Sequence, residues 1–136
     1  MRNAAREAAL NVIFAQQFNT DCIDILKKKV FKQFKLEKDA DILFAEDLIA
    51  TVEEHREKLI EDIENVCHHY LENRINPMDK SILLLAMAEI HYFHEIPAVV
   101  SASEATGLAR KYSTEKSADF VNGVLSGVIN KKDVEQ

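Results

Sequence analysis

The sequence predicts an all-α fold, and three observations support this. Only three glycines and two prolines occur among the 136 residues, which leaves few turns for a many-stranded sheet. Apolar residues recur at spacings of three and four along most of the chain, as they do on one face of a helix. Residues 77–93 are apolar on nearly every side, so a helix there must be wrapped by other helices. This run is too short and too interrupted by charge to span a bilayer.

The first helix is expected over residues 2–18. Arg2 and Arg6 are four residues apart with Asn3 between them, so they are expected to share an exposed face at the helix start. Cations at that end oppose the helix dipole, which hints at an external anion. Ordinary solvated charges are the simpler explanation of the same pattern.

The next helices combine a basic segment with an acidic one. Residues 19–21 (Asn-Thr-Asp) are expected to cap a second helix of about fourteen residues, whose lysines could meet phosphate or could be a solvated face. A third helix is expected from Asp39 and a fourth from about Arg56 to Asn73. No glycine or proline separates these two, so a single bent helix is the alternative. Residues 39–65 are strongly acidic and should repel nucleic acid.

The C-terminal half is expected to hold three helices. The central helix begins at Pro77 and covers about 77–93, and the next begins at Pro97 and ends near Tyr112, with a possible capping box at Ser101 and Glu104. Ser113 and Thr114 are expected to cap the last helix, from about 115 to 130. Gly123 and Gly127 lie four apart on it, a spacing that permits close helix packing.

Sequence motifs for catalysis and metal binding are missing. No glycine is followed by Lys-Ser or Lys-Thr, and no His-Glu-x-x-His or Cys-x-x-Cys occurs, so neither a cofactor nor a metal is expected. His91 and His94, or Cys67 with the two histidines after it, could contribute to a metal site only with further ligands from another helix. The two isolated cysteines and the absence of a signal peptide predict a reduced, cytoplasmic protein. The net charge of −6 argues against non-specific nucleic-acid binding by bulk attraction.

Several short motifs, in order, resemble the NusB family of transcription antitermination factors. The matching segments are Ala5–Ala9, Met78–Leu83, Ala88–Ile90, Ile96-Pro97, Ser103–Ala105, Ala109–Tyr112 and, strongest, Lys116–Leu125. The resemblance covers essentially the whole chain and is weakest between residues 20 and 75.

The resemblance implies one domain, 1–136, with seven helices in two helical subdomains, at about 1–75 and about 76–132. It also implies no enzymatic activity. Family members bind boxA, a short single-stranded element in ribosomal leader RNA, together with the ribosomal protein NusE, within the RNA polymerase antitermination complex.

The resemblance also suggests binding residues. For RNA these are Arg2, Asn3, Arg6, Lys111, Lys116, Phe120 and Asn122. For NusE they are Phe14, Asp79 and Glu89. Phe120 could instead be a core residue, Asn122 could hold a helix end, and Asp79 could be a simple helix-start acid.

The sequence departs from the family in having fewer N-terminal arginines, and Leu84 stands where arginine is common. Fewer cations predict weak binding to RNA alone, so affinity should depend mainly on the complex with NusE. The double change Arg2→Ala/Arg6→Ala should then cost about 1–3 kcal/mol of RNA affinity while folding is untouched.

Two other interpretations remain open at this stage. The chain could be the detached RNA-binding module of a ribosomal RNA cytosine methyltransferase, which would require an α/β domain with a catalytic cysteine. It could also be a protein-interaction scaffold without RNA binding, monomeric or homodimeric when free.

Overall fold

The computed structural model describes residues 3–19, 21–67 and 75–135 of the chain, and it confirms the all-α prediction. Within these ranges there are six helices and no strand. The helices are α1 (Asn3–Gln16), α2 (Ile23–Gln33), α3 (Asp39–Val66), α4 (Pro77–Tyr92), α5 (Ala98–Tyr112) and α6 (Glu115–Glu135). None of them is long and apolar enough to cross a membrane.

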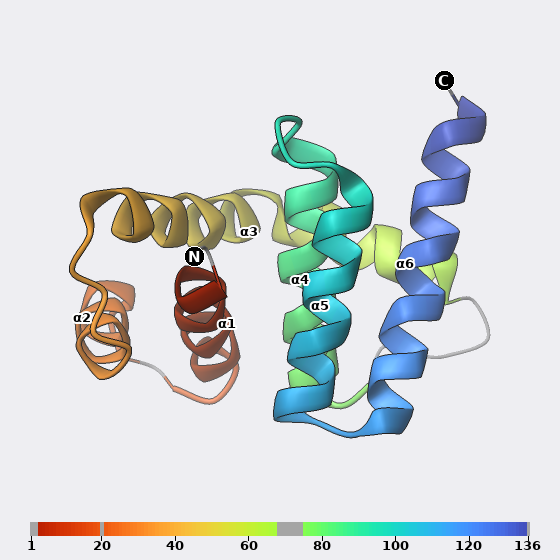
Figure 1. The fold of residues 1–136 in the computed structure, drawn as a ribbon. Helices are drawn as coiled ribbons and strands as arrows, with labels where there is room; N and C mark the ends of the chain where they lie inside the picture. Colours follow the sequence, from red (N-terminus) through yellow and green to blue (C-terminus); the bar gives the residue numbers. More distant parts are fainter. Residues whose placement is uncertain (1–2, 20, 68–74, 136) are drawn as a thin grey trace.

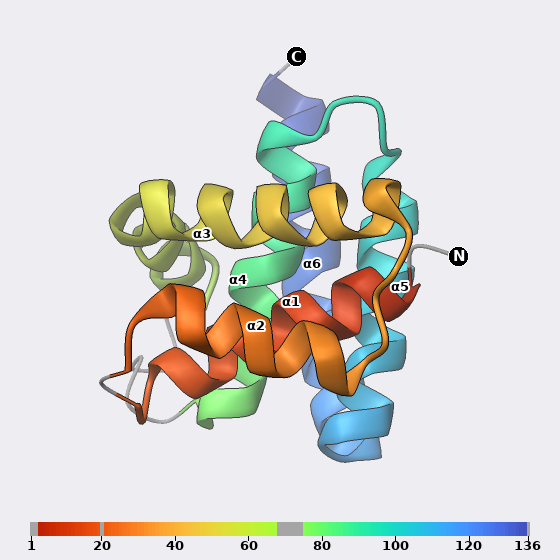
Figure 2. The same cartoon turned by 90° about the vertical axis from the view of Figure 1, so that its left-hand side faces the viewer.

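The six helices form two neighbouring groups (Figure 1). Helices α4, α5 and α6 stand side by side on the right of that view, and α1 and α2 lie on the left. Helix α3 runs along both groups, and Figure 2 shows it above α1 and α2 and crossing in front of α4. Helix α1 packs against α2, α3 and α4, while α4 packs against α1, α3, α5 and α6.

Helix α4 is the centre of the core, as its sequence predicts. Every residue from Ser81 to Ile90 is buried; those between Ser81 and Glu89 are all apolar, and these two polar residues are hydrogen-bonded. Pro77 occupies the first turn, where no N–H is needed for the helix ladder. Asn76 caps the helix, because its side-chain oxygen accepts a hydrogen bond from the N–H of Asp79 at 2.8 Å.

The prediction of seven helices is wrong by one, because the expected third and fourth helices are continuous. Helix α3 passes through His55, whose φ of −112° and ψ of 18° place a kink where the boundary was expected. Without a glycine or proline, the chain bends at this residue and does not end the helix. The ring of His55 stacks on Tyr92 of α4 at 4.0 Å between centroids. Residues 68–73, the expected end of the fourth helix, lie outside the described ranges.

Two of the expected helix starts are also corrected. Helix α2 has eleven residues and begins after Cys22, whose side chain makes no capping bond. Asn19 instead accepts a hydrogen bond from the N–H of Asp21, which closes a local turn before the helix. Ser101 lies inside α5, which begins directly after Pro97, so the capping box is wrong. The cap on α6 is confirmed, since Thr114 accepts a hydrogen bond from the N–H of Ser117 at 2.9 Å.

The glycine pair on α6 fulfils its expected packing role only in part. A methyl group at Gly127 would lie 3.4 Å from Val66 of α3, so this glycine does sit at a helix contact. A methyl group at Gly123 would meet nothing within 4 Å. Gly123 therefore does not serve close packing between the described helices.

Candidate RNA-binding surface

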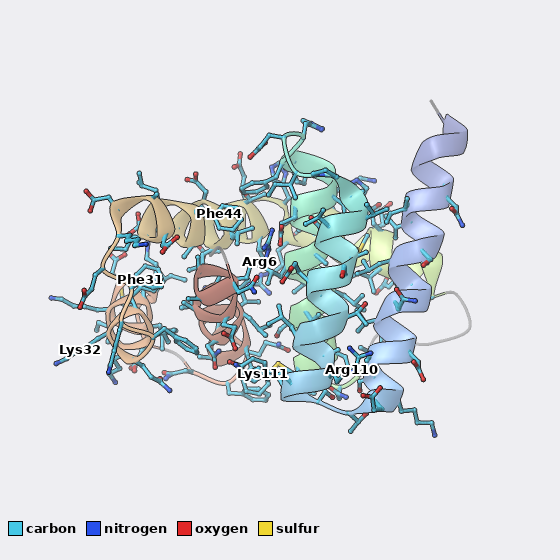
Figure 3. All side chains as sticks on the ribbon, in the orientation of Figure 1. Arg6, Phe31, Lys32, Phe44, Arg110 and Lys111 are labelled. Carbon is cyan, nitrogen blue, oxygen red and sulfur yellow. The ribbon has the colours of Figure 1, made fainter. Side chains whose placement is uncertain are left out.

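Cationic side chains gather where α5 ends and α6 begins. Arg110, Lys111 and Lys116 are all exposed there. Figure 3 labels Arg110 and Lys111 at the lower end of α5, next to the connection to α6. The guanidinium of Arg110 donates to Glu115 at 2.7 Å. This end of the molecule thus offers cations in an otherwise acidic protein.

Glu7 ties the first helix to this cationic end. Its carboxylate accepts hydrogen bonds from Lys111 and from the hydroxyl of Tyr112, the latter at 2.8 Å. The bond to Glu7 raises the pKa of Lys111 above its ordinary value, because the carboxylate favours the charged ammonium. Burial, followed by the bond to Glu7, raises the pKa of Tyr112. The exposed Asn3, one turn before Glu7, is therefore carried on the same end of α1.

Lys116 and Phe120 share a hollow with the start of α4. The hollow is lined by Ile75, Asn76, Asp79, Thr114, Lys116, Ser117 and Phe120. Phe120 is half-buried and packs against the core on one side, so its ring is neither a pure core residue nor a fully open platform. Asn122 lies elsewhere, in the groove between α5 and α6 beside Thr106 and Arg110. The structure thus groups Lys116 with Phe120 but not with Asn122.

Asp79 is more than a helix-start acid. It is only 5% exposed, and its Oδ2 accepts hydrogen bonds from Ser117 at 2.9 Å and from Asn76 at 3.0 Å. Its Oδ1 is buried and has no hydrogen-bond partner in the described part of the chain. A buried acceptor without a partner is costly in a folded protein, and this degree of burial leaves Asp79 little surface for a contact with another protein.

The end of α1 meets the same end of α4. Gln17 donates to the carbonyl oxygen of Pro77 at 2.9 Å. On the same stretch of α1, the half-buried Phe14 makes an edge-to-face contact with Phe18, with 5.1 Å between ring centroids. Phe18 is 65% exposed, which is unusual for so large an apolar side chain. The positions expected to contact NusE, Phe14 and Asp79, thus lie on two helices that touch.

The prediction that Arg6 lies on an exposed face of the first helix is wrong. Arg6 is 5% exposed and Glu89 is 1% exposed, and the two form a two-pronged ion pair with nitrogen–oxygen distances of 2.8 to 3.1 Å. Ser101 donates to the same carboxylate at 3.2 Å, and Phe44 lies under the guanidinium at 5.4 Å. The charges are buried because each supplies the other's hydrogen bonds.

This pair changes what two of the suggested binding residues can do. Arg6 presents almost no surface to RNA, and Glu89 presents almost none to a protein partner. Neither side chain is exposed as those roles require, and the burial of the pair leads us to expect that replacing Arg6 affects folding as well. Arg2 lies outside the described residues.

Sequence reasoning missed the polar groups that hold this surface together. Glu7, Ser101 and Ser117 each bridge two helices, and nothing in the spacing of the sequence pairs them with their partners. One signal was available: Arg6 and Glu89 are opposite charges, each within an apolar helical stretch. Two charges that both face a core are expected to pair.

Comparison with known proteins agrees with this architecture. Residues 3–130 match the NusB family. The transcription antitermination protein NusB of Natranaerobius thermophilus is 35% identical over 132 residues, which cover 96% of this chain and 95% of that protein.

Solved structures show the same fold. The crystal structure of the antitermination factors NusB and NusE in complex with double-stranded RNA contains a chain that superposes with a TM-score of 0.82 at 25% identity, over 96% of each chain. NusB of T. maritima superposes with a TM-score of 0.88 at 23% identity, covering all of this chain and 98% of the other. With a family match over nearly its whole length and a relative at 35% identity, this chain belongs to the NusB family.

Proposed function

We propose that this chain is a transcription antitermination factor that binds boxA-type leader RNA together with NusE, within the RNA polymerase antitermination complex. The observation that carries the proposal is the cluster of exposed Arg110, Lys111 and Lys116 where α5 ends and α6 begins, in a chain whose residues 3–130 match the NusB family. The solved relative in complex with NusE and double-stranded RNA supports the choice of both partners. The protein acts without catalysis, in the cytoplasm, as one RNA-binding domain with helical subdomains at about 1–75 and 76–132.

The RNA strand contacts the α5–α6 end. Lys111 and Lys116 meet phosphates, and the half-buried ring of Phe120 offers one edge and face to an unstacked base. Asn3 and Asn122 are both exposed and provide hydrogen-bonding groups at the two borders of this region. Arg6 acts on RNA binding indirectly, because its ion pair with Glu89 fixes the position of α1.

NusE contacts the junction of α1 and α4. Asp79 is as buried as Arg6, so it supports this junction from within: its bonds to Asn76 and Ser117 hold the start of α4 to α6. Phe14 and the exposed Phe18 add apolar surface beside it. Aromatic anchors next to a desolvated charge are typical of the residues that dominate interface energies.

Titration of a fluorescent boxA-type RNA, with and without purified NusE, tests the proposal. We expect tight binding in the presence of NusE and weaker binding in its absence. Equal affinity under both conditions would contradict the role of the partner, and no binding under either would contradict the RNA-binding function.

Two substitutions refine this test. Phe120→Leu keeps an apolar side chain against the core but removes the aromatic ring, and should lower RNA affinity by about 1–3 kcal/mol if a base stacks there. Lys58→Gln, on the distant part of α3, is the matched control and should leave RNA affinity unchanged.

A further inference from the structure

The outward side of α2 is a second cationic surface, which we call the lysine face. It consists of Lys28, Lys29 and Lys32 on the helix and Lys35 just after it, all exposed. The opposite side of α2 is apolar, with Leu26 and Val30 buried in the core. Figure 3 shows Lys32 at the outer edge of the molecule, pointing away from the other helices.

The charge on this face is concentrated against the trend of the whole protein. The net charge is −6, yet six lysines and only two acidic residues lie between residues 23 and 38. Like charges four apart on a helix, such as Lys28 and Lys32, destabilise it by about 0.2–0.5 kcal/mol. In the described structure Lys27 is paired with Asp24 at 3.7 Å, but the lysine face has no ion pair that would offset this repulsion.

We propose that the lysine face binds the phosphate backbone of RNA that extends beyond the segment held at the α5–α6 end. This inference rests on the proposed RNA-binding function and enlarges its footprint. A lysine ammonium is a mobile point charge that contacts phosphates without reading bases. Lys28 and Lys32 are separated by about 6 Å along the helix axis, so they can engage separate phosphates along one strand.

The chemistry of the face favours RNA over a protein or a membrane. Lysine is depleted at the centres of protein interfaces, where aromatic residues are enriched, and Ile25 is the one large apolar side chain exposed on the described part of α2. A helix that binds a membrane needs a free apolar side, and that of α2 is already used in the core.

The arrangement of the helices allows one strand to reach both surfaces. Helix α1 packs against α2 and lies between α2 and the lower part of α5 in Figure 1, and Glu7 of α1 bonds to Tyr112 at the end of α5. Lys32, Lys111 and Arg110 lie along the same lower side of the molecule in Figure 3. An RNA strand leaving the α5–α6 end can therefore pass across α1 toward the lysine face.

The test compares two double variants that remove the same charge from different places. Lys28→Gln/Lys32→Gln changes the lysine face, and Lys58→Gln/Lys131→Gln changes exposed lysines on α3 and α6. Each is titrated, with NusE present, against a short boxA-type RNA and against the same RNA extended at both ends. Because both variants lose two positive charges, the change in net charge alone should affect RNA affinity equally in both.

For the extended RNA, we expect the lysine-face variant to bind more weakly than both wild type and control. Its slope of log affinity against log salt should fall by about 1.4, since each single-strand phosphate contact contributes about 0.7. Between about 50 and 200 mM salt, wild-type affinity should then drop about sevenfold more than that of the variant. Affinity for the short RNA should be unchanged in both variants.

Equal losses in the two variants, or none in either, would overturn the inference. So would a lysine-face variant that binds RNA normally but no longer joins an acidic protein partner. Failure of the wild-type protein to bind either RNA would instead count against the proposed function itself, so the two hypotheses are distinguished.

Discussion

The buried ion pair between Arg6 and Glu89 makes the strongest quantitative prediction. Arg6→Ala removes one partner and leaves the other carboxylate, 1% exposed, with only the hydrogen bond from Ser101. Breaking a buried pair in this way costs about 3–5 kcal/mol of folding free energy. A protein of this size has roughly 5–15 kcal/mol to lose. The single change should therefore lower the melting temperature by roughly 6–20 °C.

A double-mutant cycle measures the interaction energy between Arg6 and Glu89 apart from their contacts with other residues. Replacing both charges by apolar side chains of similar volume, as in Arg6→Met/Glu89→Leu, removes the buried charges together and should recover most of the stability. Measured against the single changes Arg6→Met and Glu89→Leu, the coupling energy from urea unfolding, followed by circular dichroism, should exceed about 2 kcal/mol. An Arg6→Ala variant that loses less than about 1 kcal/mol, with an unchanged denaturant slope, would refute the reasoning.

The same cycle decides how Arg6 affects RNA. The Arg6→Met/Glu89→Leu variant has lost the cation, and if it regains wild-type stability, apolar packing in place of the ion pair holds α1 against α4. We expect it to bind RNA, with NusE, as tightly as wild type does. A loss of about 1–3 kcal/mol would show instead that the guanidinium itself contacts the strand.

Three further predictions follow from local geometry. Gly107→Ala on α5 should stabilise the protein by about 0.5–1 kcal/mol in urea unfolding, because the added methyl group meets nothing within 4 Å; a loss of stability would contradict this. Burial raises the pKa of the Cys67 thiol, whereas Cys22 is exposed. Brief iodoacetamide treatment of the native protein near neutral pH should therefore modify Cys22 alone, as judged by mass spectrometry. Modification of both thiols at similar rates would contradict the burial of Cys67. Glu7→Gln removes the negative charge that is paired with Lys111, so the affinity for boxA-type RNA, titrated with NusE present, should rise. An unchanged affinity would mean that Lys111 does not face the RNA strand.

Helix α4 and the all-α fold were predictable because they depend on local patterns. Ten consecutive buried residues, from Ser81 to Ile90, leave an unmistakable apolar run, and Asn76 and Pro77 mark its start. The continuity of α3 was predictable only as an alternative: the lack of glycine and proline allows one bent helix, but the residue type does not dictate the backbone angles of the kink at His55.

The candidate site was predictable in outline only. The family resemblance identified Lys111, Lys116 and Phe120, which the structure places at one end of the molecule or beside it. It also suggested Arg6 as an exposed contact, although this side chain is bound to a residue 83 positions away. The apolar surroundings of Arg6 and Glu89 are the one sequence signal for this pair, and the spacing of the two residues carries no information about it.

The two-pronged bond between Arg6 and Glu89 has a consequence for the speed and cost of binding. A fork of parallel hydrogen bonds accepts one relative orientation of α1 and α4, so the parts of the surface contributed by the two halves of the chain already stand in register before any ligand arrives. RNA and NusE then meet a preorganised template, and little of their binding energy is spent on ordering the protein.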